Sequence, residues 1–117
     1  MSRSPKPKRF AAYAAFWPHY LREHARPMTR ALHYIGAGLA LLLMMLGAAV
    51  NPWAFVAVPF AGYGFAWVAH GAVERNRPAT FTHPWWSLIS DFRMFGLFVT
   101  GQIEPHLVKA GVTAART

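Results

Sequence analysis

Cysteine is absent from the 117-residue chain, so disulfides, thiolate-bound zinc, iron–sulfur clusters and thiol catalysis are excluded. Charge is also scarce. Charged residues make up 14% of the chain, whereas about 25% is usual in soluble domains, and 55% of the residues are hydrophobic. This composition excludes a disordered polyelectrolyte and argues against an ordinary soluble protein. The length suits one small domain.

Acidic residues are few, 4 against 12 Lys and Arg, and the formal net charge is +8. Such a balance suggests either nucleic acid or anionic lipid as a partner. Seven of the basic residues lie within the first 30, and no Lys, Arg, Asp or Glu occurs from Ala31 to Val73. A nucleic-acid-binding protein would spread its basic residues along one exposed face. Basic residues on both sides of a long apolar block instead indicate a membrane protein, and we expect no nucleic-acid partner.

The apolar block divides at Asn51-Pro52, a turn signal that the first helix cannot cross. Its two parts, about residues 31–50 and 53–73, are each close to the ~20 helical residues that cross a bilayer. A buried hairpin in a soluble protein would need amphipathic helices, and both segments are apolar on all sides. We therefore predict an all-α integral membrane protein with two transmembrane helices that form a hairpin.

Amphipathic interfacial helices are expected on both sides of the hairpin, one over about residues 10–24 with a break at Pro18 and one over about residues 85–101. The connector of the hairpin has no Lys or Arg, whereas both outer ends do. The positive-inside rule therefore places both termini in the cytoplasm. The expected organisation is a disordered basic tail, a single membrane domain and a frayed tail, at residues 1–9, 10–104 and 105–117.

Four of the six histidines lie close to the cytoplasmic ends of the expected spans: His24, His33, His70 and His83. A hairpin brings the start of its first helix beside the end of its second, so His33 and His70 must share one membrane face. Glu74 follows His70 by one helical turn and lies on the same face. The chain break at Pro27 allows His24 to turn toward the others, so the sequence permits all four histidines to converge.

Clustered neutral imidazoles without thiolates favour a transition metal, iron or zinc. Acids near such a site orient the imidazoles by accepting their second N–H, and Glu74 and Asp91 are placed to do so. The alternative for each histidine is a place among the lipid headgroups without a function. Glu74 and Arg77 have an alternative too, since they can simply form an ion pair at the interface.

Several motifs resemble those of the short bacterial members of the 2-hydroxy fatty acid dioxygenase family. They are Tyr20-x3-His24, Leu32-His33-x-Ile35-Gly36, His70-x3-Glu74-x-Asn76-Arg77-Pro78-Ala79, His83-Pro84 and Asp91-Phe92-Arg93-Met94-Phe95. The resemblance covers roughly Phe16 to Gly101. It implies an Fe(II)-dependent enzyme of the bacterial inner membrane that uses O2 to shorten 2-hydroxy fatty acids by one carbon. It also implies that His24, His33, His70 and His83 are the iron ligands.

Two hypotheses follow from the sequence. In the first, the chain is this dioxygenase, with a fatty-acid or lipid substrate lying in the membrane and Arg77 or Arg30 pairing with its carboxylate. In the second, it is a non-catalytic membrane protein whose histidines hold a structural ion or no ion. Measuring the iron content distinguishes them. In either case, we also consider that the chain forms a homo-oligomer.

Overall fold

The computed structural model describes residues 10–77 and 82–112 of the chain, and these residues contain helices and no strand. The predicted all-α fold is therefore confirmed, whereas the expected basic tail at 1–9 lies outside the described residues. The helical elements are α1 (Tyr13–Arg22), α2 (Pro27–Ala49), α3 (Ala54–Val68), the π-helical turn η1 (Ala69–Glu74), α4 (Pro84–Val99) and α5 (Ile103–Ala110).

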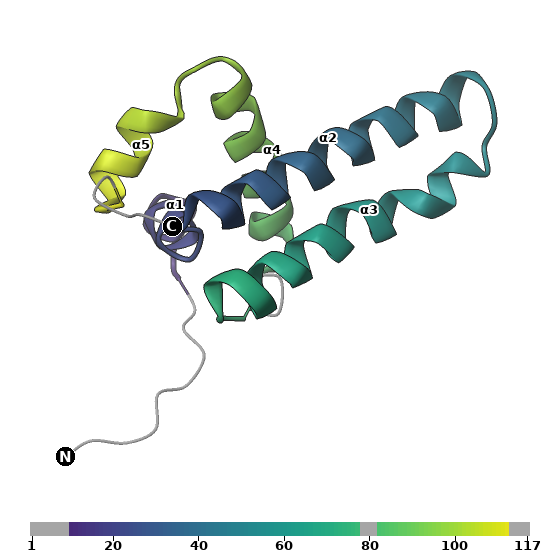
Figure 1. The fold of residues 1–117 in the computed structure, drawn as a ribbon. Coiled ribbons are helices and arrows are strands. Elements are labelled where there is room, and N and C mark those ends of the chain that lie inside the picture. The colour runs from purple at the N-terminus through teal and green to yellow at the C-terminus, as the bar shows by residue number, and fades with distance from the viewer. Residues whose placement is uncertain (1–9, 78–81, 113–117) are drawn as a thin grey trace.

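The predicted hairpin is formed by α2 and α3, which run side by side in opposite directions (Figure 1). Its tip lies at Asn51-Pro52, where the Asn51 side-chain oxygen accepts a hydrogen bond from the Trp53 backbone N–H at 3.0 Å. Helix α2 begins at Pro27, earlier than expected, because proline fits the first turn of a helix, where its missing N–H has no intrahelical partner. The second span continues from α3 through η1.

Small residues line the contact between α2 and α3, and large apolar residues face outward. A Cβ atom on Gly36 would lie 3.0 Å from the Ala61 carbonyl oxygen, so glycine is needed for this close approach. On the outer face, Met45 and Phe60 are 66% and 75% exposed. Both α2 and the continuous segment 54–74 are long and apolar enough to cross a membrane, and only 28% and 22% of their most apolar windows are buried. A core helix of a soluble protein would be mostly buried.

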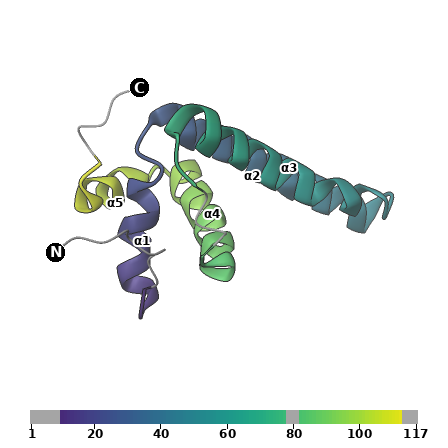
Figure 2. The ribbon, with the colours of Figure 1, turned by 90° about the horizontal axis from the view of Figure 1, so that it is seen from below.

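Helices α1, α4 and α5 gather at the end of the hairpin opposite its tip (Figure 2). Their shared core is built from Phe16, Tyr20 and Leu21 of α1, Met94 of α4 and Leu107 of α5. Helix α1 continues through Pro18, where a break was expected, since the residues around this proline are buried in that core. Helix α4 occupies nearly the range predicted for the second interfacial helix.

The frayed tail expected from residue 105 is replaced over 103–110 by helix α5. Its Leu107 and Ala110 pack into the core against α1, and Gly111 ends the helix with a φ of 85°, which glycine adopts without strain. The burial of one short apolar face, which local sequence does not reveal, orders this segment. Residues 113–117 lie outside the described part of the chain.

Candidate metal centre

Three histidines from three different elements meet at the base of the hairpin. His24 follows the end of α1, His33 is the seventh residue of α2, and His70 lies in η1. Their Nε2 atoms form a nearly equilateral triangle, with distances of 3.0 Å (His24 to His33), 3.2 Å (His33 to His70) and 3.1 Å (His70 to His24). All three side chains are buried, and this group could hold a metal ion.

The size of the triangle matches the spacing of ligands on one ion. For an ion about 2.0–2.1 Å from each imidazole nitrogen, two such nitrogens lie about 2.8–3.4 Å apart in octahedral to tetrahedral arrangements. The observed edges of 3.0–3.2 Å fall within this range. The three Nε2 atoms can therefore bind one metal ion from the same side, with further coordination positions left for other ligands.

The outer nitrogens of two of these histidines face acceptors that fix their tautomers. His24 Nδ1 lies 2.7 Å from the Tyr20 carbonyl oxygen and therefore donates to it. His70 Nδ1 lies 2.5 Å from Asn76 Oδ1, and the amide group of Asn76 is oriented because its Nδ2 donates to the Glu23 carbonyl at 3.0 Å. Each Nδ1 carries the proton, so each Nε2 presents a lone pair to the triangle.

The third imidazole, His33, points its Nδ1 at Asp91, at 3.7 Å from Oδ1. The Tyr20 hydroxyl donates a hydrogen bond to that same Asp91 oxygen. Burial raises the pKa of the Asp91 carboxyl to about 7, although the bond from Tyr20 acts in the opposite direction. Burial also lowers the pKa of His24 well below its usual value, as do the charges that His33 and His70 would carry if protonated.

These contacts aim the Nε2 lone pairs of His24 and His70 at one buried point, and His33 Nε2 lies within 3.0–3.2 Å of both. A metal ion bound at this point would accept lone pairs from all three imidazoles. Carboxylate, amide and carbonyl groups that accept the outer N–H of metal-binding histidines are the usual supports of such sites. The donor set of three neutral imidazoles suits iron, zinc or copper.

The turn η1 sets the position of His70 and was not predicted from the sequence. It is a π-helical turn, a distortion that recurs at functional sites. Arg75 ends it in the left-handed region, with a φ of 63°, and the Asn76 backbone N–H then donates to the His70 carbonyl at 2.8 Å. This reversal brings the Asn76 side chain back to His70. Tyr20 and Asn76 both stood in the motifs that carry the family resemblance, but neither was assigned a role at the site from the sequence.

Glu74 lies next to the centre but supports it by a different route from the one we expected. Its Oε1 accepts hydrogen bonds from the Thr29 hydroxyl at 2.6 Å and from the Arg26 backbone N–H at 3.1 Å. These bonds tie the end of η1 to the start of α2, the two segments that carry His70 and His33.

The two arginines considered as partners of a substrate carboxylate lie at the same end of the hairpin. Arg77 is exposed in the loop after η1. Arg30 donates to the His24 and Ala25 carbonyls at 2.8 and 2.9 Å.

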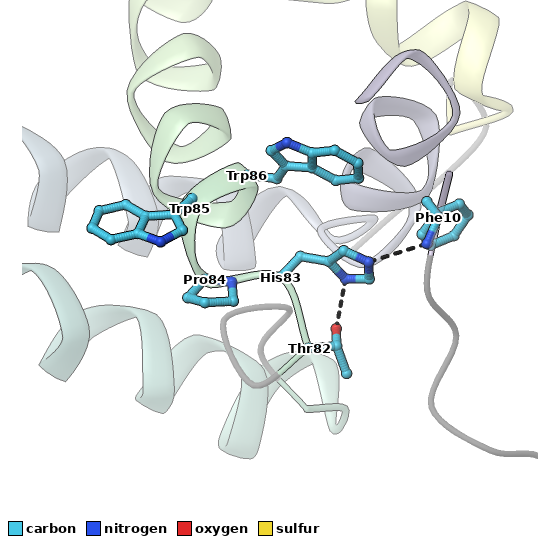
Figure 3. Close-up of a pocket in the computed structure, with 6 residues that line it drawn as sticks. All are labelled: Phe10, Thr82, His83, Pro84, Trp85 and Trp86. Atoms are coloured by element: carbon cyan, nitrogen blue, oxygen red, sulfur yellow. Dashed lines mark hydrogen bonds between the residues drawn. The ribbon is translucent and has the colours of Figure 1, made fainter. Parts of the chain in front are cut away.

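His83 is not part of this cluster. It lies just before α4, where its side chain faces Phe10 and Thr82 (Figure 3). Its Nε2 accepts a hydrogen bond from the Phe10 backbone N–H at 3.1 Å, and its Nδ1 lies 2.8 Å from the Thr82 hydroxyl. Its ring stacks on Trp86 with centroids 5.5 Å apart. The expected convergence therefore holds for His24, His33 and His70. The ring of His83 instead lies against Phe10 and Phe16, with centroid distances of 5.6 and 5.0 Å.

Comparison with known proteins agrees with the motifs. Residues 10–103 match the family described as 2-hydroxy-palmitic acid dioxygenase Mpo1-like, which confirms the resemblance seen in the sequence. No curated protein and no solved structure matches the chain. The matched segment contains all three clustered histidines together with Tyr20, Asn76 and Asp91. Because the match covers well over half of the chain, the protein belongs to the 2-hydroxy-palmitic acid dioxygenase Mpo1-like family.

Proposed function

We propose that the protein is a membrane-embedded Fe(II) dioxygenase that shortens 2-hydroxy fatty acids by one carbon. The observation that carries the proposal is the triangle of Nε2 atoms, 3.0–3.2 Å apart, whose outer nitrogens all face acceptors. The family name supplies the reaction class and the type of substrate. Iron is favoured over zinc because a dioxygenase needs a redox-active metal, which zinc is not.

In this proposal His24, His33 and His70 hold the iron, which when bound supplies redox chemistry with O2. Tyr20, Asn76 and Asp91 position the three imidazoles and keep their lone pairs directed inward. Glu74 keeps η1 against α2.

The family resemblance implied His83 as a fourth ligand. The contacts with Phe10 and Thr82 instead favour a role in holding the start of α4. Arg77 remains a candidate partner for the substrate carboxylate, since it is exposed at the end of the hairpin that carries the histidine centre.

We further propose that α2 and the segment 54–74 cross the bacterial inner membrane with both termini in the cytoplasm. The outward-facing apolar residues of both helices support insertion, because this much exposed apolar surface is unfavourable in water. Helices α1 and α5 lie together at the end of the hairpin opposite its tip. The exposed basic residues Arg22, Arg26, Arg75 and Lys109 belong to that end, and the tip has none.

The test is product analysis with purified protein. The full chain in detergent, loaded anaerobically with Fe(II), is given 2-hydroxypalmitic acid and O2, and the acids formed are separated by mass. We expect the acid that is one carbon shorter, and we expect it to disappear when a chelator removes the iron or when Zn²⁺ replaces it. Stable binding of iron without this product would instead support the second hypothesis, a non-catalytic protein with a structural ion.

A further inference from the structure

An apolar cavity of about 250 Å³ begins at the histidine centre and runs along the hairpin. His33 and Asp91 form its polar end. Its remaining walls come from α2, α3 and α4, and they include Ala40, Met44 and Val58. From His33 to Met44 the cavity follows α2 for about 16 Å, at 1.5 Å of rise per residue. One polar end and a long apolar wall are the features of a site for an amphipathic molecule.

The space inside this cavity depends on residues with little or no side chain. Ala37 and Ala40 line it on α2, and Gly62 lines it on α3. Gly62 differs from Gly36 in its surroundings: a Cβ atom on Gly62 meets nothing within 4 Å, whereas one on Gly36 would press on the Ala61 carbonyl. Gly62 is therefore not required for helix packing. Its missing side chain leaves room in the cavity instead.

The surroundings of the cavity limit what can occupy it. The outer faces of α2 and α3 are apolar, so the cavity lies within the part of the protein that we place in the bilayer. An aliphatic chain can therefore reach it from the membrane without crossing water. The cavity is smaller than the ~300–1,000 Å³ of sites that enclose a drug-sized ligand. It suits a single narrow chain.

We infer that this cavity binds the aliphatic chain of the 2-hydroxy fatty acid, with the carboxyl and hydroxyl end at His33 and Asp91, and that Gly62 and Val58 determine which chains fit. The inference rests on the proposed function, which gives the substrate class, and adds to it the place of the chain and the residues that select it. The direction of entry follows: the substrate arrives sideways from the bilayer, and its reacting end reaches the base of the hairpin.

Photolabelling tests the cavity without relying on turnover. The probe is 2-hydroxypalmitic acid with a diazirine at the far end of its chain, added to the full protein in lipid nanodiscs and activated by light. We expect label on peptides containing Met44, Val58 or Gly62, and we expect excess unlabelled 2-hydroxypalmitic acid to abolish it. Labelling that this competitor leaves unchanged would mean that ordinary lipid fills the cavity and would overturn the inference.

Two matched pairs of variants test the selecting residues. Gly62→Leu fills the cavity, and Gly64→Leu places the same side chain on the same helix outside the cavity, where a Cβ atom also meets nothing. Val58→Phe and the exposed Val56→Phe form the second pair. The cavity variants should lower probe affinity roughly thirty-fold, since two to three methylenes lose their buried contact. The controls should match the wild type.

Equal losses in a cavity variant and its control, or no loss in either cavity variant, would overturn the inference. If Gly62→Leu fails to fold, the Val58 pair decides alone. Iron content, measured in the same samples, shows whether the centre is intact. If the competitor abolishes labelling and Gly62→Leu weakens it, but the protein forms no product, the cavity assignment stands and the dioxygenase proposal fails. If both cavity variants form the product normally, the dioxygenase proposal stands and the cavity assignment fails.

Discussion

The Nε2 atoms of His24 and His70 lie 3.1 Å apart, although 46 residues separate the two histidines in the chain. The contact joins the end of α1 to η1, and His33 completes the triangle from α2. The centre therefore forms only when all three segments are docked. Because a metal ion that binds only this docked state stabilises it, metal binding and assembly of the base of the hairpin are coupled.

Removing Asp91 should weaken metal binding without removing a ligand. Asp91→Ala takes away the acceptor near His33 Nδ1 and the partner of the Tyr20 hydroxyl. Loss of such a supporting group typically weakens metal binding by about 10- to 100-fold. We expect this range for the Fe(II) dissociation constant of Asp91→Ala, and a smaller increase for Tyr20→Phe. Glu104→Ala, an exposed acid in α5, serves as the control and should bind iron like the wild type.

Glu74 should matter for stability rather than for the chemical step. Thr29→Val removes the 2.6 Å hydrogen bond to Glu74 while keeping the shape of the side chain. We expect a loss of about 1.5–3 kcal/mol in the free energy of unfolding, since a hydrogen bond to a carboxylate is lost. Thermal unfolding in detergent measures it. Turnover per bound iron should stay near the wild-type value. A Glu74→Gln variant that folds and binds iron normally but forms no product would contradict this role.

The close approach of α2 and α3 should depend on Gly36 and not on Gly64. A side chain at Gly36 meets the Ala61 carbonyl and Phe65 at 3.0 Å, whereas one at Gly64 meets nothing within 4 Å. Gly36→Val should therefore destabilise the protein by about 1–3 kcal/mol, the usual cost of overpacking. The same change at Gly64 alters helix propensity alone. Similar unfolding midpoints for the two valine variants would show that the hairpin does not pack as described.

The orientation can be tested by labelling, which is simple because the chain has no cysteine. Asn51→Cys at the tip of the hairpin should react with a membrane-impermeant maleimide added outside spheroplasts. Lys109→Cys in α5 should react only after the membrane is opened. This pattern follows from basic residues at one end and none at the tip. Labelling of Lys109→Cys alone in intact spheroplasts would reverse the proposed topology.

Much of this arrangement could be predicted from the sequence because two strong constraints were visible in it. The charge-free block Ala31–Val73, divided at Asn51-Pro52, required a hairpin, and a hairpin required His33 and His70 to share one end. The sequence carried no comparable signal for the local backbone geometry. The π-helical turn at His70 and the left-handed Arg75 depend on tertiary contacts, so the place of the Asn76 side chain was missed.

The position of His83 shows the same limit. The sequence permitted His83 to join the other histidines, but its direction depends on a contact with a distant part of the chain. His83 Nε2 accepts a hydrogen bond from the backbone N–H of Phe10, 73 residues away. Helix α5 was missed for a related reason, since it is ordered by burial of Leu107 against α1 rather than by a strong pattern of its own.

The most direct test of the central claim is the iron content of the purified full chain, measured after anaerobic loading with Fe(II) and removal of unbound metal. For three imidazoles that share one ion, we expect about one iron per chain in the wild type and almost none in His70→Ala. His19→Ala in α1 should retain the wild-type level, because His19 is not part of the triangle. A wild-type protein without iron, or equal loss of iron in His70→Ala and His19→Ala, would contradict the account.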